Sequence, residues 1–134
     1  MQGIGRGSVS DSHPFSEFLV TSTMSPNELT LVAKHVMKLL VERRYTELHE
    51  ATNGTRLSAE DMQGAVEDVG AALVMPPESV WRDMDVVAIR NWPGAFNVRF
   101  HLWTRSGRSN WSVELTVHSK SGKPMIEVDD IHPL

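Results

Sequence analysis

The spacing of apolar residues changes at Met75-Pro76-Pro77. Before this point they recur every three or four residues, which is the period of an amphipathic helix. After it they alternate with polar residues, which is the period of a half-buried strand. Helices followed by strands predict an α+β fold, with the helices packed on one face of a single antiparallel sheet.

Three helices are predicted before this change. Ser25-Pro26-Asn27-Glu28 combines a capping box with a proline at the first helical position, which predicts a helix from residue 26 to about 43. A shorter helix is expected over residues 45–51, ended by Asn53-Gly54. A third is expected to begin after the N-cap Ser58 and to continue to Met75.

The first 23 residues have no apolar period and are rich in glycine and serine. They are therefore predicted to be a flexible lead-in, followed by a single domain over residues 24–134. A chain that started at Met24 would keep every predicted helix and strand.

Four strands are predicted after Pro77, over residues 85–90, 96–103, 111–118 and 124 to about 131. Short turns between them predict an antiparallel meander with the first strand at an edge. Every second residue faces the helices and forms the predicted core face: Phe96, Val98, Phe100, Leu102, Val113, Leu115, Val117, Ile126 and Val128.

The opposite face of the sheet is the candidate functional surface. If residues 105–110 form the hairpin loop, Trp103 lies opposite Ser112, His101 opposite Glu114, and Arg99 opposite Thr116. The next hairpin would place Glu114 near Asp129 and Thr116 near Glu127. The candidate binding residues on this face are Arg99, His101, Trp103, Glu114, Glu127 and Asp129.

This face allows two interpretations. It is either a solvated surface held by cross-strand charge pairs, or a protein-binding surface with Trp103 as its aromatic anchor. His101 with Glu114 could also be a general base and its orienting carboxylate, but no nucleophile or acid pair accompanies them. No catalytic residue is therefore predicted. A competing hypothesis is an enzyme or small-ligand binder, with a pocket between helices and sheet and Trp81, Trp92 or Tyr45 at its mouth.

No metal or cofactor site is predicted. Asp130 and His132 could suggest a metal, but Asp129 and Asp130 should point to opposite faces of the strand unless a bulge intervenes. The chain of 134 residues has no cysteine, which excludes disulfides, thiolate metal sites and cysteine nucleophiles.

Charge and hydropathy restrict the partners. The formal net charge of −4 argues against broad nucleic-acid binding and fits a basic protein partner. No stretch approaches the roughly 20 apolar residues that cross a bilayer, so no membrane association is expected and the predicted location is cytoplasmic.

Four segments resemble a small uncharacterised bacterial domain family: residues 56–60, 102–104, 107–109 and 127–132. The similarity covers roughly residues 29–134. It implies the cystatin-like cone of the nuclear-transport-factor-2-like group, and transfers no catalytic residue. Small acidic domains of this kind include immunity proteins, which implies a non-enzymatic protein-binding function with a basic toxin as partner.

Removal of residues 1–23 is expected to leave the fold intact, because the segment carries no periodic apolar pattern. The measurement is the thermal midpoint of the full chain and of a chain that starts at Met24. A loss of several degrees would show that the segment packs on the domain.

Overall fold

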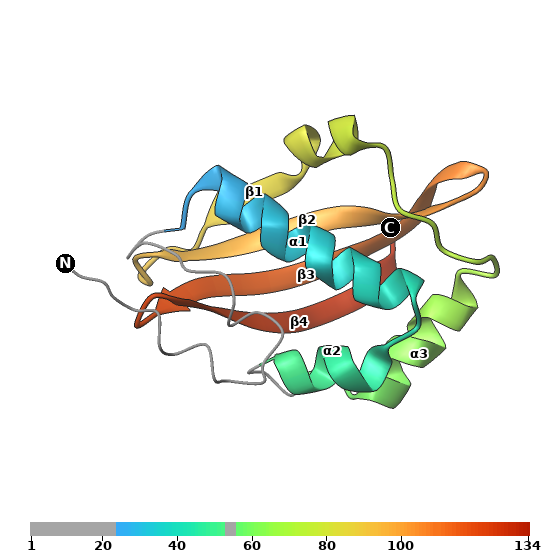
Figure 1. Cartoon of the computed structure of the whole chain (residues 1–134), viewed down its shortest axis with the longest axis horizontal. Helices are drawn as coiled ribbons and strands as arrows, with labels where there is room; N and C mark the ends of the chain where they lie inside the picture. Colours follow the sequence, from blue (N-terminus) through green and yellow to red (C-terminus); the bar gives the residue numbers. More distant parts are fainter. Residues whose placement is uncertain (1–23, 53–55) are drawn as a thin grey trace.

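The computed structural model describes residues 24–52 and 56–134 (Figure 1). The helices are α1 (Pro26–Val41), α2 (Tyr45–Ala51), α3 (Ala59–Asp68) and the 3-10 helix η2 (Glu78–Asp83). The strands are β1 (Asp85–Ala88), β2 (Ala95–Thr104), β3 (Gly107–Lys120) and β4 (Lys123–Pro133). This order confirms the predicted α+β fold. The predicted lead-in and the predicted helix end at Asn53-Gly54 lie outside the described residues.

α1 begins where its capping box predicts. The Ser25 hydroxyl accepts a hydrogen bond from the Glu28 amide at 3.2 Å, and the Glu28 carboxylate accepts one from the Ser25 amide at 2.6 Å. These bonds satisfy two of the amides that a helix start leaves unpaired.

None of the described helices is long and apolar enough to cross a membrane.

α3 is shorter than predicted, because it ends at Asp68 and not near Met75. Ser58 and Asp61 form its capping box as predicted, with both bonds at 3.0 Å. Gly70 has a φ of 83°, the left-handed conformation that commonly ends a helix. Residues 71–77 are then extended, and Leu73 forms a bridge with Thr104 of β2.

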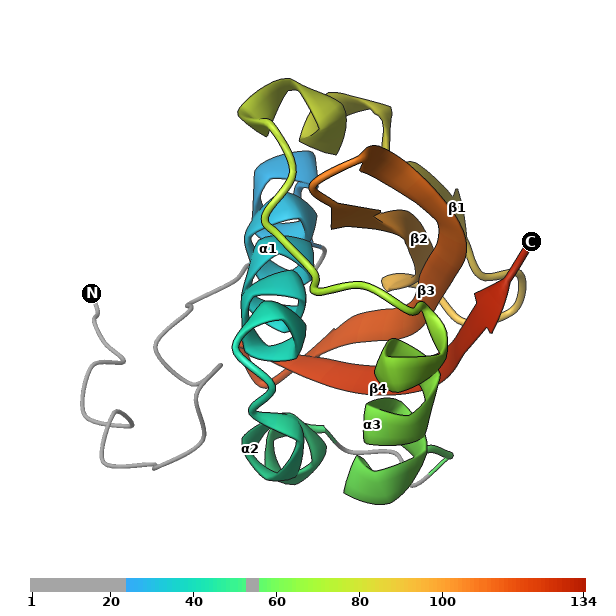
Figure 2. The same ribbon diagram turned by 90° about the vertical axis from the view of Figure 1, so that its right-hand side faces the viewer.

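The four strands form one open antiparallel sheet in the order β1-β2-β3-β4, so β1 is an edge strand as predicted. The sheet curves around α1, which covers its concave face (Figure 2). Of the three predicted helices α1 covers this face directly, while α2 and α3 add buried side chains to the same core from the side of β4. α2 and α3 lie side by side beyond the edge formed by β4 (Figures 1 and 2). We call the opposite, convex side of the sheet the outer face.

The core lies between α1 and the concave face and includes Leu48 and Ala51 of α2 and Met62 and Val66 of α3. Every residue predicted to form the core face is buried except Phe96, which is half-buried. From α1 the core receives a continuous stripe: Leu29, Val32, Ala33, Val36, Met37, Leu39 and Leu40. The strand period therefore assigned the two faces of the sheet correctly.

The register of the β2–β3 hairpin differs from the prediction. The turn contains only Arg105 and Ser106, and β3 already begins at Gly107. A bulge in β3 then adds residues before the regular ladder, in which Arg99 faces Glu114 and His101 faces Ser112. Ser109 holds this bulge, because its hydroxyl donates to the Leu102 carbonyl at 2.7 Å and accepts from the Trp111 amide at 3.1 Å.

A second bulge lies in β4. Thr116 faces Glu127 as predicted, but Glu114 faces Asp130 and not Asp129. Asp129 is the extra residue, and its carboxylate accepts a 2.6 Å hydrogen bond from the Thr116 hydroxyl on the outer face. Asp129 and Asp130 therefore both lie on that face.

Leu115→Ala is expected to lower the free energy of unfolding by about 2–5 kcal/mol, because Leu115 is fully buried in a central strand. Thr116→Ala is the control on the outer face and should cost about 1 kcal/mol through its lost hydrogen bond. Urea denaturation measures both. Equal losses would contradict the assignment of the two faces.

Candidate functional site

One row of charged residues crosses all four strands of the outer face. Asp85 of β1 faces Arg99 of β2, Arg99 faces Glu114 of β3, and Glu114 faces Asp130 of β4. The Arg99 guanidinium Nε lies 3.7 Å from the Glu114 carboxylate. The row thus holds one guanidinium group and three carboxylates, which leaves it acidic.

A neighbouring acidic pair is reached from outside the sheet. Arg56, which precedes α3, places its guanidinium Nε 3.7 Å from the Glu127 carboxylate and 3.4 Å from that of Asp129. Its side chain is mostly exposed, so this contact adds little to stability. At the centre of the outer face the described chain brings together two guanidinium groups, those of Arg56 and Arg99, and five carboxylates: Asp85, Glu114, Glu127, Asp129 and Asp130. Arg108, Lys120 and Lys123 lie on the same face toward the ends of the strands.

The next row of the outer face, beside the row of Arg99 and Glu114, carries histidines. His101 and His132 lie on either side of Ser112, whose side chain is fully buried. The His132 ring nitrogens lie 3.1 Å from the Asp130 carboxylate and 3.5 Å from that of Glu114. His132, and not His101, is therefore the histidine beside Glu114. This corrects the predicted pairing of His101 with Glu114.

His101 makes a different contact. Its Nδ1 lies 3.2 Å from the carbonyl oxygen of Ser109, in the β3 bulge. The change of partner follows from the register, which moves Glu114 opposite Arg99. Within residues 24–52 and 56–134, no group of three or more histidine, aspartate or glutamate side chains is arranged to hold a metal ion.

Trp103 is less exposed to a binding partner than its predicted role as an aromatic anchor requires. It is half-buried, packs against the hydrophobic core, and lies opposite Arg108 at the far end of β2. With Arg99, His101 and Trp81 it lines a small cavity of about 190 Å³. Three of the predicted binding residues therefore meet at one hollow, and Trp103 contributes to packing there.

Trp92 is the aromatic residue exposed beside the outer face, and sequence reasoning did not assign it there. It lies in the β1–β2 turn, is 41% exposed, and packs against His118 in a tilted arrangement, with ring centroids 4.6 Å apart and 47° between the ring planes. His118 alternates in phase with Glu114 and Thr116. Val87, on the same face of β1, is 62% exposed. The signal was a tryptophan in a tight hairpin turn, where the chain cannot bury it.

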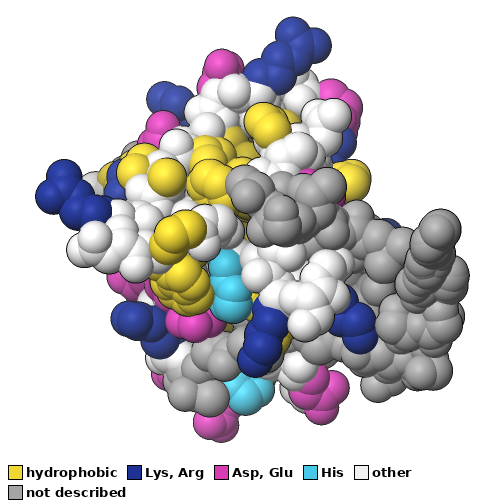
Figure 3. All heavy atoms as spheres, turned by 90° about the vertical axis from the view of Figure 1, so that its left-hand side faces the viewer, with side chains coloured by type: hydrophobic (Ala, Val, Ile, Leu, Met, Phe, Trp, Pro, Cys, Tyr) yellow, Lys and Arg dark blue, Asp and Glu magenta, His cyan; other side chains and the backbone are white. Residues whose placement is uncertain are grey.

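Trp81 was predicted to lie at a pocket mouth, and it is buried. Its ring contacts Phe100 at 5.6 Å between centroids. It also lines an open apolar groove of about 450 Å³ with Met24, Leu29 and Val86. Figure 3 looks onto the end of the molecule where α1 begins, and shows hydrophobic side chains at its surface.

Tyr45 lines a different cleft of about 470 Å³, built by the helices and not by helices and sheet. Burial raises the pKa of its hydroxyl, which Arg43 lowers and Glu67 raises to smaller degrees. The charges of Arg43 and Glu67 therefore both influence the pKa of this hydroxyl.

Comparison with known proteins gives one match. A family model described as a domain of unknown function (DUF7668) matches residues 37–134. The match begins inside α1 and includes α2, α3 and the whole sheet. No curated protein and no solved structure matches the chain.

The ionisation of Tyr45 can be measured directly, because it is the one tyrosine of the chain. Its folded pKa is raised, so its contribution to stability is complete below pH about 10 and is lost as the pH rises further. Ultraviolet absorbance titration should show ionisation at higher pH in the folded protein than in urea. Glu67→Gln should lower the folded pKa. Equal pKa values in the two states would contradict the burial of the hydroxyl.

Proposed function

The chain belongs to the DUF7668 family, and from the geometry of its outer face we propose that it is a non-enzymatic protein-binding domain. The observation that carries the proposal is the acidic row of Asp85, Arg99, Glu114 and Asp130. No described helix covers this row (Figures 1 and 2). The partner that fits it is a protein with a basic surface.

These charges contribute little to folding. Exposed ion pairs are worth about 0–1 kcal/mol each, and the Arg99–Glu114 contact is partly exposed. At the centre of the face five carboxylates exceed what two guanidinium groups neutralise, whereas Arg108, Lys120 and Lys123 lie toward its ends. Such an imbalance raises the association rate of a basic partner and selects against acidic ones.

The proposed contact surface consists of the predicted residues together with Trp92. Arg99, His101, Glu114, Glu127 and Asp129 supply polar contacts at the centre. Trp92 and Val87 supply exposed apolar area at one end, where an aromatic anchor can enter a pocket of the partner. Trp103 supports the surface from the core side.

The most concrete form of this function is an immunity protein that neutralises a basic toxin in the cytoplasm. Small size, net negative charge and the absence of cysteine support this form. We also propose that the curvature of the sheet around α1 is that of a cystatin-like, nuclear-transport-factor-2-like cone (Figure 2). The second candidate function, small-ligand binding, is favoured by the cleft at Tyr45.

Charge reversal of the row tests the proposal. Asp85→Lys with Asp130→Lys should reduce the association rate for a partner captured from the native host, and should weaken the salt dependence of binding. Trp92→Ala should weaken binding by about 2 kcal/mol or more without changing the fold. Glu50→Lys on α2 is the control, because it reverses an exposed charge away from the outer face. Titration calorimetry and surface kinetics measure the effects.

If a captured partner binds the charge-reversed variant as tightly as the wild type, the outer face is not the interface. Trp103→Ala separates packing from binding, because it should lower the free energy of unfolding through lost core contacts. Unchanged stability with lost binding would restore Trp103 as the anchor in place of Trp92.

A further inference from the structure

A cleft separate from the outer face opens where the three helices meet. It has a volume of about 470 Å³ and lies between the end of α1, the start of α2, α3, and the extended segment after Gly70. This volume is in the range of small-molecule sites. None of its lining residues belongs to the sheet.

Three apolar side chains lie at the base of the cleft, although most of its exposed surface is polar. Leu40 of α1, Val66 of α3 and Leu73 line it, and all three are buried among the core residues. The floor depends on the early end of α3, because the chain turns at Gly70 and brings Leu73 back toward α1. Leu40 is fully buried and Val66 and Leu73 are nearly so, so the apolar area open to a ligand is small and fits a short aliphatic group.

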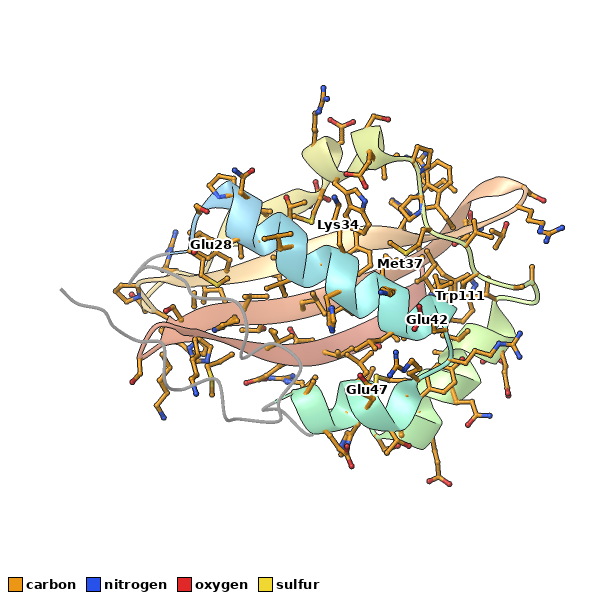
Figure 4. All side chains as sticks on the ribbon, viewed as in Figure 1. Glu28, Lys34, Met37, Glu42, Glu47 and Trp111 are labelled. Carbon is orange, nitrogen blue, oxygen red and sulfur yellow. The ribbon has the colours of Figure 1, made fainter. Side chains whose placement is uncertain are left out.

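The rim carries a guanidinium group with unused binding capacity. Arg43 has a φ of 60°, the left-handed conformation at the end of α1 where glycine is usual. Its neighbour Arg44 takes both nearby carboxylates, with Glu42 at 3.1 Å and Glu47 at 2.6 Å. Figure 4 labels these two glutamates at the α1–α2 junction. Among the described residues Arg43 has no ion-pair partner, and it lines the cleft.

The rim also carries an acid and a phenol. Glu67 and Gln63 lie one turn apart on α3 and are joined by a 3.0 Å hydrogen bond from the Gln63 amide nitrogen. This bond leaves the second carboxylate oxygen of Glu67 and the amide oxygen of Gln63 as acceptors. Tyr45 is largely buried and lines the cleft, so its phenol is a donor group at the rim. The cleft thus offers a positive and a negative group around an apolar floor.

We propose that this cleft binds a zwitterionic α-amino acid with an aliphatic side chain. The ligand carboxylate pairs with Arg43 and accepts from the Tyr45 hydroxyl, since both are donors at the rim. The ligand ammonium donates to Glu67 and to the Gln63 amide oxygen. The side chain covers Leu40, Val66 and Leu73.

Three probes that differ by one charged group test the assignment. L-leucine carries both charges, isocaproate lacks the ammonium, and isoamylamine lacks the carboxylate. Leucine at millimolar concentration should raise the thermal midpoint of the full chain and shift the amide resonances of Gly70, Ala71 and Ala72, which line the cleft. The other two probes should bind about tenfold more weakly or worse.

Arg43→Gly is the decisive variant. Glycine fits the left-handed position without strain, so the variant should be at least as stable as the wild type, yet bind leucine about tenfold more weakly. Glu67→Gln should weaken leucine binding similarly and leave isocaproate binding unchanged. Arg90→Gln, which removes an exposed charge elsewhere, should change neither.

The proposal is overturned if leucine shifts neither the midpoint nor the amide resonances. It is also overturned if isocaproate binds as tightly as leucine, or if Arg43→Gly retains full leucine affinity. None of these results bears on the outer face, because the cleft variants leave every residue of that face unchanged.

Discussion

The packing of α1 against the concave face of the sheet is the contact on which the rest of the molecule depends. α1 buries a continuous stripe that includes Val36 and Met37, and the strands meet it with every second residue. Apolar burial stabilises by about 25 cal/mol per Å², so this contact decides which side of each strand faces inward. Once Val98 and Leu115 are inside, their neighbours along each strand, Arg99 and Glu114, must lie outside. The outer face is therefore a consequence of the core.

The sequence was sufficient to predict the two faces of the sheet but not its register. The predicted pairing of β2 with β3 was displaced by two residues. Because side chains alternate between the faces with a period of two, this displacement leaves each residue on its predicted face. That error arose from Ser109, whose hydroxyl replaces ladder hydrogen bonds inside β3 and has no signature in hydrophobic spacing. The bulge at Asp129 was equally hidden, since it depends on the Thr116 hydroxyl across the strand pair.

The candidate site was predictable in composition and less so in detail. Arg99, Glu114, Glu127 and Asp129 lie on the outer face, because alternation alone places them there. Trp103 obeys the same alternation, yet the segment before η2 returns along this end of β2, where the Val74 amide donates to the Trp103 carbonyl at 2.9 Å, and Trp103 is half-buried. This burial depends on a segment distant in the sequence, so the spacing of residues within β2 could not predict it. The helix-lined cleft was also invisible, because the apolar stripe of α3 seemed to continue through Gly70 to Leu73, where the chain in fact turns.

The bulge in β4 determines where this strand can lose a residue. On either side of Asp129, Val128 and Ile131 point into the core, although three positions separate them along the strand. A β4 strand shortened by Asp129 alone would keep both inside, with Asp130 between them, as a regular ladder requires. A deletion among the regularly alternating residues from Pro124 to Val128 would instead exchange inward and outward side chains on one side of the gap. Asp129 is thus the position at which this strand can differ in length between related chains without inverting a face.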